Sequence, residues 1–350
     1  MSLDVLNDRC GDAYDTFLKG DPHALFFASN DYRRFLRELL GAEDHYLLSL
    51  DDRQEIVGAL PLFIRRNDIF GDVVNSLPFY GSNGGVLAAD GRPETIRELM
   101  EAYGTLIASE NCAAATMVTS PFEETPTMYE RYLSPTFVDG RIGQWTPLPE
   151  GDGGIEEKLL FLYHPKTRNL VRKAMKSGFH ITHGPGEGPM AFLRETHGEN
   201  MGEIGGATKP DRFFDLIPKH FAYDRQYRIY TAYKGGEPAA ALLLFYFHRT
   251  VEYFTPVVKK AYRADQPLSL LIHQAMADAA VAGYGWWNWG GTWHSQDGVY
   301  HFKKRWGTQD RPYFYYTNIR NPGLLELTKE QLLHEYPYFY VLPFDRLPAR

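Results

Sequence analysis

Residues 281–307 read VAGYGWWNWGGTWHSQDGVYHFKKRWG, and this stretch decides the fold. Ala282-Gly283 ends a preceding apolar helix, because glycine after an apolar periodic run is a helix stop signal. Tyr284–Trp289 then predicts a short, buried strand of aromatic residues. Gly290-Gly291 lets the backbone leave that strand at a tight angle. The stretch therefore predicts a helix, a strand and a glycine turn in succession, as in an α+β domain.

The second half of the stretch is basic. Lys303, Lys304 and Arg305 stand next to one another within Val299–Trp306. A backbone freed by two glycines can approach a substrate closely, and ammonium or guanidinium groups hold phosphate or a developing oxyanion. The combination is what a transferase needs.

The same order of elements occurs twice in the chain: a hairpin with a long apolar strand, a further strand, a helix and a last strand. The first copy comprises Tyr46–Leu50, Ile56–Ile64, Pro93–Glu110 and Ala114–Thr119. The second comprises Arg228–Tyr233, Pro238–Phe247, Val251–Thr255, Pro267–Ala282 and Tyr284–Trp289. A repeat of such a long period predicts two similar α+β domains, with mixed sheets flanked by helices.

The end of the second copy resembles the signature of the Fem-type (FemABX) aminoacyltransferases, in which F-K-x-x-W-G follows a Gly-Gly strand end. The matching residues are Gly290, Gly291, Phe302, Lys303, Trp306 and Gly307. The resemblance extends over about Asp21–Thr317 and implies two tandem GNAT-like domains, GNAT being the acyl-CoA N-acyltransferase fold. We expect one domain over 1–148 and a second, with the catalytic cleft, over 155–320, joined by the turn-rich Pro147–Gly154. Residues 321–350 are expected to form a helix and an aromatic tail that packs on the core.

Pro165–Gly178, PKTRNLVRKAMKSG, predicts a basic helix. Its cations are Lys166, Arg168, Arg172, Lys173 and Lys176, and it has no carboxylate. An idle surface helix normally mixes charges of both signs, so the pattern favours an anionic partner over a merely solvated face. The segment resembles the K-x-R-x-x-x-R-K-A-x-K-x-G helix of Fem-type proteins. That resemblance implies phosphate contact by Arg168, Arg172, Lys173 and Lys176, with a nucleotide-activated or lipid-diphosphate substrate or with RNA.

Two further groups are candidate binding residues. Ser76–Gly85, SLPFYGSNGG, is either an ordinary turn or an anion nest of backbone N–H groups at Gly84 and Gly85, with Tyr80 and Asn83 to orient a ligand. Trp289 and Trp293 belong to a group of four tryptophans in which core packing competes with stacking on a base or sugar.

Acetyl-CoA enzymes of the GNAT fold hold the pyrophosphate with R/Q-x-x-G-x-G/A between a strand and a helix N-terminus. The second copy has Tyr262–Pro267, YRADQP, at the equivalent place, and the first copy has Ala89–Pro93, ADGRP. Neither has the glycine pattern, and Asp265 would face a pyrophosphate. The coenzyme A site is therefore expected to be absent from both copies.

Our first hypothesis is transfer of an amino acid from aminoacyl-tRNA to the amine of a phosphorylated or peptide-like acceptor, such as a cell-wall precursor or a natural product. Lys303 would be catalytic and stabilise the charge on the ester carbonyl or on the 3′-oxygen leaving group. Lys304 would face solvent or an RNA backbone. The alternatives are an N-acyltransferase that uses acyl-CoA, and a non-catalytic binder of phosphorylated glycan or peptide. A structural role for Lys303, paired with a carboxylate, also stays open.

Composition sets the remaining bounds. The chain has 350 residues and a net charge of −7, so a polyanion site must be a local patch. Cys10 and Cys112 have no metal-ligand spacing, and the histidines have none either, so we expect no metal and no cofactor. The N-terminus lacks a signal peptide pattern, and the longest apolar run, Ala239–Phe247, is too short to cross a bilayer. We expect a cytoplasmic protein without stable membrane insertion.

Overall fold

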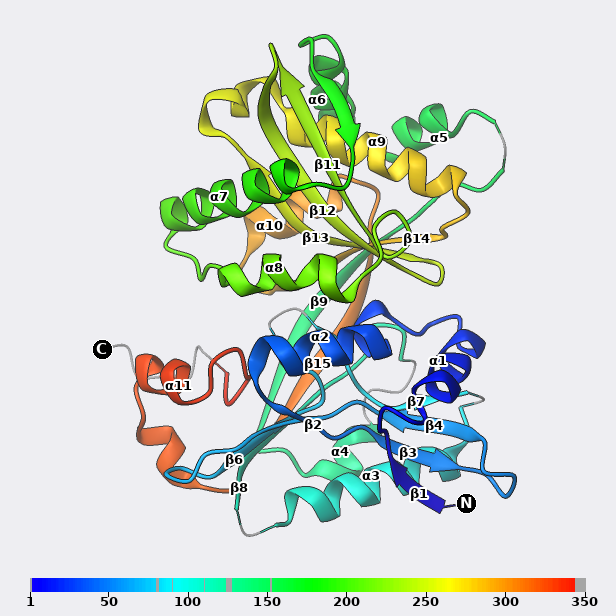
Figure 1. Cartoon of the computed structure of the whole chain (residues 1–350), viewed down its shortest axis with the longest axis vertical. Coiled ribbons are helices and arrows are strands. Elements are labelled where there is room, and N and C mark those ends of the chain that lie inside the picture. The colour runs from blue at the N-terminus through cyan, green and yellow to red at the C-terminus, as the bar shows by residue number, and fades with distance from the viewer. Residues whose placement is uncertain are drawn as a thin grey trace. The chain divides into compact units, whose positions relative to one another are not determined.

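The structure is a computed structural model that describes residues 2–79, 82–89, 91–109, 111–123, 128–151 and 153–343. The chain forms two compact units (Figure 1). The first comprises Met1–Arg141 and Pro312–Arg350, and the second comprises Ile142–Arg311. The chain passes from one unit to the other inside β9 (Phe137–Pro147) and inside β15 (Gln309–Ile319). The sequence-based division placed the boundary after β9 and set 321–350 apart, whereas this segment belongs to the first unit.

The first unit contains a four-stranded sheet of order β1-β3-β4-β7 and, in a second sheet, the neighbouring strands β2, β5, β6, β8 and β15. The strand bounds are β1 (Ser2–Val5), β2 (Glu43–Asp44), β3 (Leu47–Leu50), β4 (Ile56–Leu60), β5 (Phe63–Arg65), β6 (Asp72–Asn75), β7 (Leu87–Ala88) and β8 (Cys112–Val118). The helices are α1 (Gly11–Gly20), η1 (Phe26–Ala28), α2 (Asn30–Leu40), α3 (Pro93–Ile107), α4 (Met128–Leu133), η3 (Pro322–Glu326) and α11 (Lys329–Glu335). The apolar side of α3 packs on β3 and β4, where Leu99 and Tyr103 join the core.

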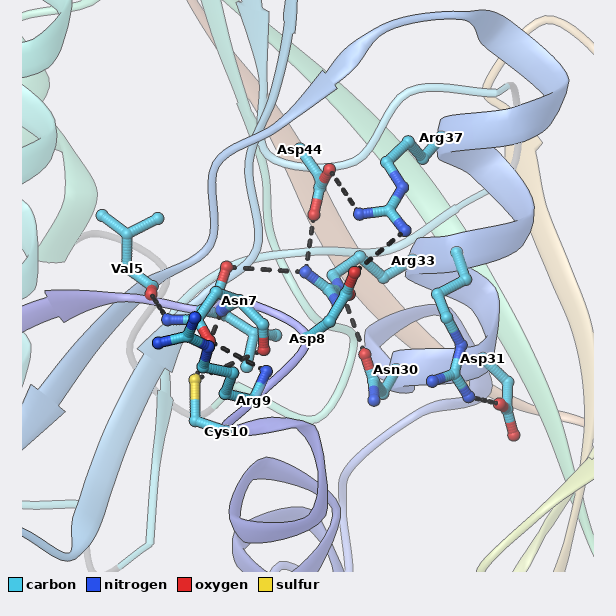
Figure 2. Close-up of polar contacts among 12 residues, drawn as sticks. Val5, Asn7, Asp8, Arg9, Cys10, Asn30, Asp31, Arg33, Arg37 and Asp44 are labelled. Carbon is cyan, nitrogen blue, oxygen red and sulfur yellow. Dashed lines mark hydrogen bonds and ion pairs between the residues drawn. The ribbon is translucent and has the colours of Figure 1, made fainter.

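An ion-pair network fixes α2 to the strands beside it (Figure 2). The guanidinium of Arg33 is 1% exposed and lies 2.6 Å from both Asp8 and Asp44, and its Nε donates to Asn30. A buried cation is tolerated only when its charge and donors are satisfied, as they are here. Ser29 caps the same helix by accepting a hydrogen bond from the N–H of Tyr32.

The C-terminal segment packs into the first unit. The amide of Asn75, at the end of β6, donates to the carbonyl of Tyr340 at 2.8 Å and accepts from the N–H of Tyr340 at 2.7 Å. The N–H of Phe79 donates to Tyr338 O. The predicted single helix of the tail is in fact two short helices, η3 and α11, because the capping box of Thr328 and Gln331 starts a new helix.

The second unit is built on strands in the order β10-β11-β12-β13-β14, followed by the end of β9. Their bounds are β10 (His180–His183), β11 (Tyr227–Lys234), β12 (Glu237–Phe247), β13 (Thr250–Val258) and β14 (Trp286–Trp293). The helices are α5 (Ile155–Leu162), α6 (Pro165–Met175), α7 (Glu187–Ile204), α8 (Asp211–His220), η2 (Lys260–Asp265), α9 (Pro267–Val281) and α10 (Asp297–Lys304). Figure 1 shows α9 on one face of this sheet and α7 on the other.

Burial on both faces explains the sequence of β12, where Ala239–Tyr246 has no exposed residue. The repeated order of hairpin, strand, helix and strand is present in both units. Two details differ from the expectation. β14 continues through Gly290-Gly291 to Trp293, and α7 and α8 form in a region where no helix was predicted from the sequence. Among the described helices, none has the length and the apolar character that crossing a bilayer requires.

Candidate active site

Lys303 lies in the last turn of α10 and turns inward. Its side chain is 7% exposed, and its Nζ donates to Gly291 O at 2.9 Å, to Thr292 Oγ1 at 2.9 Å and to Gly290 O at 3.4 Å. Within the described residues no carboxylate pairs with this ammonium, so the predicted structural alternative of a carboxylate partner is not found. Burial lowers the pKa of Lys303 to about 8. The group is therefore a charged ammonium at neutral pH, held by uncharged oxygens.

The oxygens that hold Lys303 come from an unusual stretch of β14. Gly290 has φ +73, a left-handed conformation that a residue with a Cβ adopts only with strain. The side chain of Asn288 accepts a hydrogen bond from the N–H of Gly290 at 2.8 Å, which closes a local turn within the strand. The turn directs the carbonyls of Gly290 and Gly291 at α10. The glycine pair thus changes the direction of the backbone within β14, and the strand continues beyond it.

Beyond Lys303, polar side chains tie α10 to β9. Thr292 Oγ1 donates to Gln144 Oε1 at 3.1 Å while it accepts from Lys303. Gln144 Nε2 in turn donates to Tyr300 O at 3.2 Å and to Thr308 Oγ1 at 3.4 Å. These bonds leave the ammonium little freedom, which is what a charge used in catalysis needs.

An acid that the sequence did not indicate lies close by in the strand pair. β13 and β14 run parallel and pair only from Thr250 with Trp286 to Glu252 with Asn288. Glu252, at the last paired position, is 3% exposed and accepts from Asn288 Nδ2 at 2.6 Å, while its Oε1 has no hydrogen-bond partner among the described residues. Burial raises the pKa of Glu252 to about 8. The acid is therefore mostly neutral at physiological pH.

Trp289 and Trp293 differ in their surroundings. Trp289 is 2% exposed, its Nε1 donates to Thr146 Oγ1 at 2.8 Å, and its ring lies 5.6 Å from that of Trp306. It is thus packed as a core residue, and no exposed ring face supports the predicted stacking. Trp293 is half-buried at the end of β14, nearer to Lys303 in sequence.

The basic helix is α6, and its cations fall into two groups. Lys173 Nζ donates to Ala264 O at 2.8 Å, so this predicted phosphate ligand holds η2 instead. Among the described residues, no hydrogen bond or ion pair engages the side chains of the other cations of α6, which are Lys166, Arg168, Arg172 and Lys176. Arg168, Arg172 and Lys176, which follow one another at intervals of four residues, all belong to this uncompensated group.

The N-terminus of α6 meets the C-terminus of α10. His164 N donates to Arg305 O at 2.9 Å, and a Cβ on Gly307 would lie 2.5 Å from Leu162. Arg305 is exposed and, like the α6 cations, has no partner within the described part of the chain. Lys304 differs, because its Nζ pairs with Asp310 at 2.9 Å. The uncompensated positive charge thus continues from α6 to the helix that carries Lys303.

Comparisons with known proteins fit this arrangement. Residues 166–304 match the family described as an acetyltransferase (GNAT) domain. FemX has a similar structure, with a TM-score of 0.73 at 14% identity over 93% of this chain and 99% of that one. The chain has a tandem GNAT fold of the Fem type.

Two other solved structures share this tandem GNAT fold. The C-terminal domain of a putative lysylphosphatidylglycerol synthetase from Agrobacterium fabrum gives a TM-score of 0.55 at 11% identity, over 94% of this chain and 97% of that one. A tandem GNAT protein from the clavulanic acid biosynthesis pathway gives 0.55 at 12% identity, over 91% and 98%. A search of curated proteins found no match. The comparisons show a tandem GNAT fold, in which residues 166–304 match an acetyltransferase (GNAT) domain.

The turn before α9 is where a GNAT enzyme would bind a pyrophosphate. Here η2 leads to Gln266, which has φ +61, and Pro267 occupies the first helical position and has no N–H to offer. Asp265 pairs with Lys234 at 2.7 Å, and this hydrogen bond lowers the pKa of its carboxyl. A carboxylate and a proline thus stand where the GNAT motif has glycine N–H groups.

The glycine loop of the first unit is packed inside it. Gly84 N donates to Val118 O at 3.1 Å, and a Cβ on Gly84 would lie 2.6 Å from Ser76 Oγ. Asn83 is buried and donates to Thr119 O, while a Cβ on Gly85 would lie 3.0 Å from the Tyr129 hydroxyl. Internal packing thus explains both glycines, and the N–H of Gly84 is not free for an anion. Tyr80 lies outside the described residues.

The described residues contain no group of three His, Cys, Asp or Glu side chains that could hold a metal ion. The sequence pointed to Lys303 and the α6 cations as candidate site residues, and these stay predictions. It missed Glu252, Asn288, Thr292 and Gln144. One signal was present for Asn288, a polar residue between tryptophans in a strand of aromatic residues. No local signal marked Glu252, because its role depends on the register between two strands distant in sequence.

Proposed function

We propose that the protein transfers an aminoacyl group from aminoacyl-tRNA to an amine of a phosphorylated or peptide-like acceptor. The observation that carries the proposal is the run of uncompensated cations on α6 and at Arg305, which leads to the helix of Lys303. Like charges on one surface repel, and a polyanion that neutralises several of them recovers that energy. A tRNA acceptor arm offers a row of phosphates, whereas the net charge of −7 makes non-specific attraction by the whole chain unfavourable.

The turn before α9 supports the same donor. The carboxylate of Asp265 and the ring of Pro267 stand where a GNAT enzyme offers backbone N–H groups to a pyrophosphate. A donor without a pyrophosphate at this position avoids electrostatic repulsion by the carboxylate of Asp265. The ester of an aminoacyl-tRNA is such a donor.

The chemistry is simple in outline. The neutral acceptor amine attacks the ester carbonyl carbon, a C–N bond forms, and the bond from that carbon to the ribose oxygen breaks. The proton of the amine leaves to water or to the departing oxygen. The ammonium of Lys303 stabilises the negative charge that develops on oxygen. Its longest hydrogen bond, 3.4 Å to Gly290 O, is the one that a substrate oxygen would replace.

A second candidate is N-acylation from acyl-CoA. The observation that favours it is the match of residues 166–304 to an acetyltransferase (GNAT) domain. The two candidates share the fold and the amine acceptor, and they differ in the donor.

The test is a donor panel. Purified protein is incubated with labelled aminoacyl-tRNAs or with labelled acetyl-CoA, each with a panel of amines, and the label on the amine is counted. We expect transfer from at least one aminoacyl-tRNA and loss of that transfer in Lys303→Ala. Transfer from acetyl-CoA alone would establish the second candidate, and transfer from neither donor, with tight binding of a phosphorylated glycan or peptide, would favour a non-catalytic binder.

A further inference from the structure

The most buried ionisable group near Lys303 has no place in the chemistry above. Glu252 and Asn288 form the last pair between β13 and β14, and they are 3% and 1% exposed. A buried carboxyl with an unpaired oxygen costs free energy, since its desolvation is not recovered by a second hydrogen bond. A group retained at such a cost invites a functional explanation.

A chain of hydrogen bonds leads from this acid to the ammonium. Asn288 Nδ2 donates to Glu252 Oε2 at 2.6 Å, and Asn288 Oδ1 accepts from Gly290 N at 2.8 Å. The carbonyls of Gly290 and Gly291 then accept from Lys303 Nζ at 3.4 Å and 2.9 Å. Each step involves atoms of adjacent groups, so the orientation of one constrains the next.

The amide of Asn288 can work in only one orientation. The N–H of Gly290 requires an acceptor, so the amide oxygen must face Gly290 and the amide nitrogen must face Glu252. An acceptor oxygen at position 252 stabilises this orientation of the Asn288 amide. A side chain at position 252 without an acceptor would leave the N–H groups of that amide buried and unpaired. Because Gly290 has φ +73, its peptide depends on this contact to stay in the conformation that aims its carbonyl at Lys303.

We propose that Glu252 is a positioning residue, which acts through Asn288 on the Gly290-Gly291 carbonyls and so fixes the ammonium of Lys303. The inference rests on the proposed role of Lys303, and Glu252 itself touches no substrate. Burial keeps this acid mostly neutral, because its pKa is raised to about 8, so it adds little negative charge beside the lysine. Its contribution is geometric.

Two substitutions at position 252 distinguish the effect of the acceptor oxygen from the effect of the side-chain volume. Glu252→Gln keeps an oxygen for Asn288, and Glu252→Met keeps the length of the side chain without the acceptor. Asn288→Ala breaks the next link and serves if Glu252→Met does not fold. We expect Glu252→Gln to retain single-turnover transfer within about threefold of the native rate. Glu252→Met and Asn288→Ala should lose about tenfold, with donor affinity within twofold. In a Lys303→Ala background the same changes should cost less than twofold, because the residue that they position is gone.

A second readout does not depend on activity. Amine-reactive labelling followed by mass spectrometry gives the reactivity of Lys303, with Lys209 as internal reference, since burial also lowers the pKa of Lys209 to about 8. We expect Glu252→Met to raise labelling of Lys303 at least threefold while Lys209 is unchanged, and Glu252→Gln to change neither. Equal increases at both lysines, or none at Lys303, would overturn the proposal. Selective labelling without any transfer from aminoacyl-tRNA would instead refute the proposed function alone.

Discussion

Both units contain a parallel strand pair whose second strand follows a helix, and the two pairs end differently. In the first unit β6 pairs with β8 up to Asn75 and Thr116, and in the second β13 pairs with β14 up to Glu252 and Asn288. Each pair therefore ends in two buried polar side chains. What satisfies those side chains differs between the units.

In the first unit the chain itself occupies the polar pair. The backbone of Tyr340 forms two hydrogen bonds with the Asn75 amide, and Thr116 Oγ1 lies 3.4 Å from Tyr340 O and 3.0 Å from Thr317 Oγ1. In the second unit Glu252 and Asn288 bond to each other, one carboxyl oxygen stays unpaired, and the next residues hold Lys303. In our proposal, one copy of the fold uses this position for packing, while the other keeps polar groups there for chemistry.

Lys303 should show the largest effect if the second unit carries the chemistry. Replacing Lys303 with Ala removes the charge that stabilises the transition state, so turnover should fall by about a hundredfold or more. Lys303→Arg should recover part of it. The pKa of Lys303 is about 8, so native activity should decline as pH rises through 8, while Lys303→Arg should not decline there. Single-turnover rates from pH 6 to 10 test this, and an identical alkaline limb in both proteins would contradict it.

The cations of α6 should come next. Replacing Arg168, Arg172 and Lys176 together with Ala should weaken tRNA binding tenfold or more at about 0.15 M salt. The slope of the logarithm of the binding constant against the logarithm of the salt concentration should become less negative by roughly two to three. Lys219→Ala, an exposed cation on α8, is the matched control. Binding isotherms at several salt concentrations provide the measurement. Equal losses in the triple variant and the control would return α6 to a solvated surface helix.

Asn75 should affect stability and not turnover. Asn75→Ala removes the hydrogen bond to the buried N–H of Tyr340 and the 2.8 Å bond to its carbonyl, which keeps the longer bond from Thr116 Oγ1. This loss should lower the free energy of unfolding by about 1–3 kcal/mol. Tyr340→Phe retains both backbone bonds to Asn75 and removes the phenol bond to Asp139, so it is the side-chain control for the backbone contribution. Denaturant melts and single-turnover rates are compared on the same samples. If Asn75→Ala slowed the transfer step at unchanged stability, the proposed difference between the two units would be wrong.

Lys304 should show the smallest effect. Its exposed ion pair with Asp310 is worth about 0–1 kcal/mol, and its charge is already compensated. Lys304→Ala should therefore change turnover and tRNA affinity by less than threefold. Assayed beside Lys303→Ala, it controls for the loss of one positive charge in the same turn of α10. A loss as large as that of Lys303→Ala would mean that burial does not distinguish the two lysines.

Local patterns carried much of the fold and part of the site. The alternation of strands and helices, the glycine pair in β14 and the cluster of cations on α6 are all encoded within short stretches of sequence. Of the two aromatic neighbours of Lys303, Trp306 is buried in the core, whereas Phe302 is 39% exposed although its ring lies 6.1 Å from that of Trp289.

Contacts between segments that are distant in the chain could not be predicted from the sequence. The pairing of Glu252 with Asn288 requires the register of two strands, and the bonds of Asn75 require a segment from the end of the chain. The same limit applies to Lys173, whose ammonium donates to the carbonyl of Ala264, and to Trp289, whose ring packs in the core. The sequence alone does not distinguish a cation or an aromatic ring that contacts a ligand from one that contacts other residues of the same protein.

The most direct test of the central claim, that the second unit binds an aminoacyl-tRNA donor, is hydrogen–deuterium exchange with a non-hydrolysable aminoacyl-tRNA analogue and, separately, with acetyl-CoA. We expect the analogue to slow exchange in peptides covering residues 163–179 and 294–308, and acetyl-CoA to leave residues 259–270 unchanged. Protection by the analogue confined to the first unit, or protection of residues 259–270 by acetyl-CoA, would contradict the account.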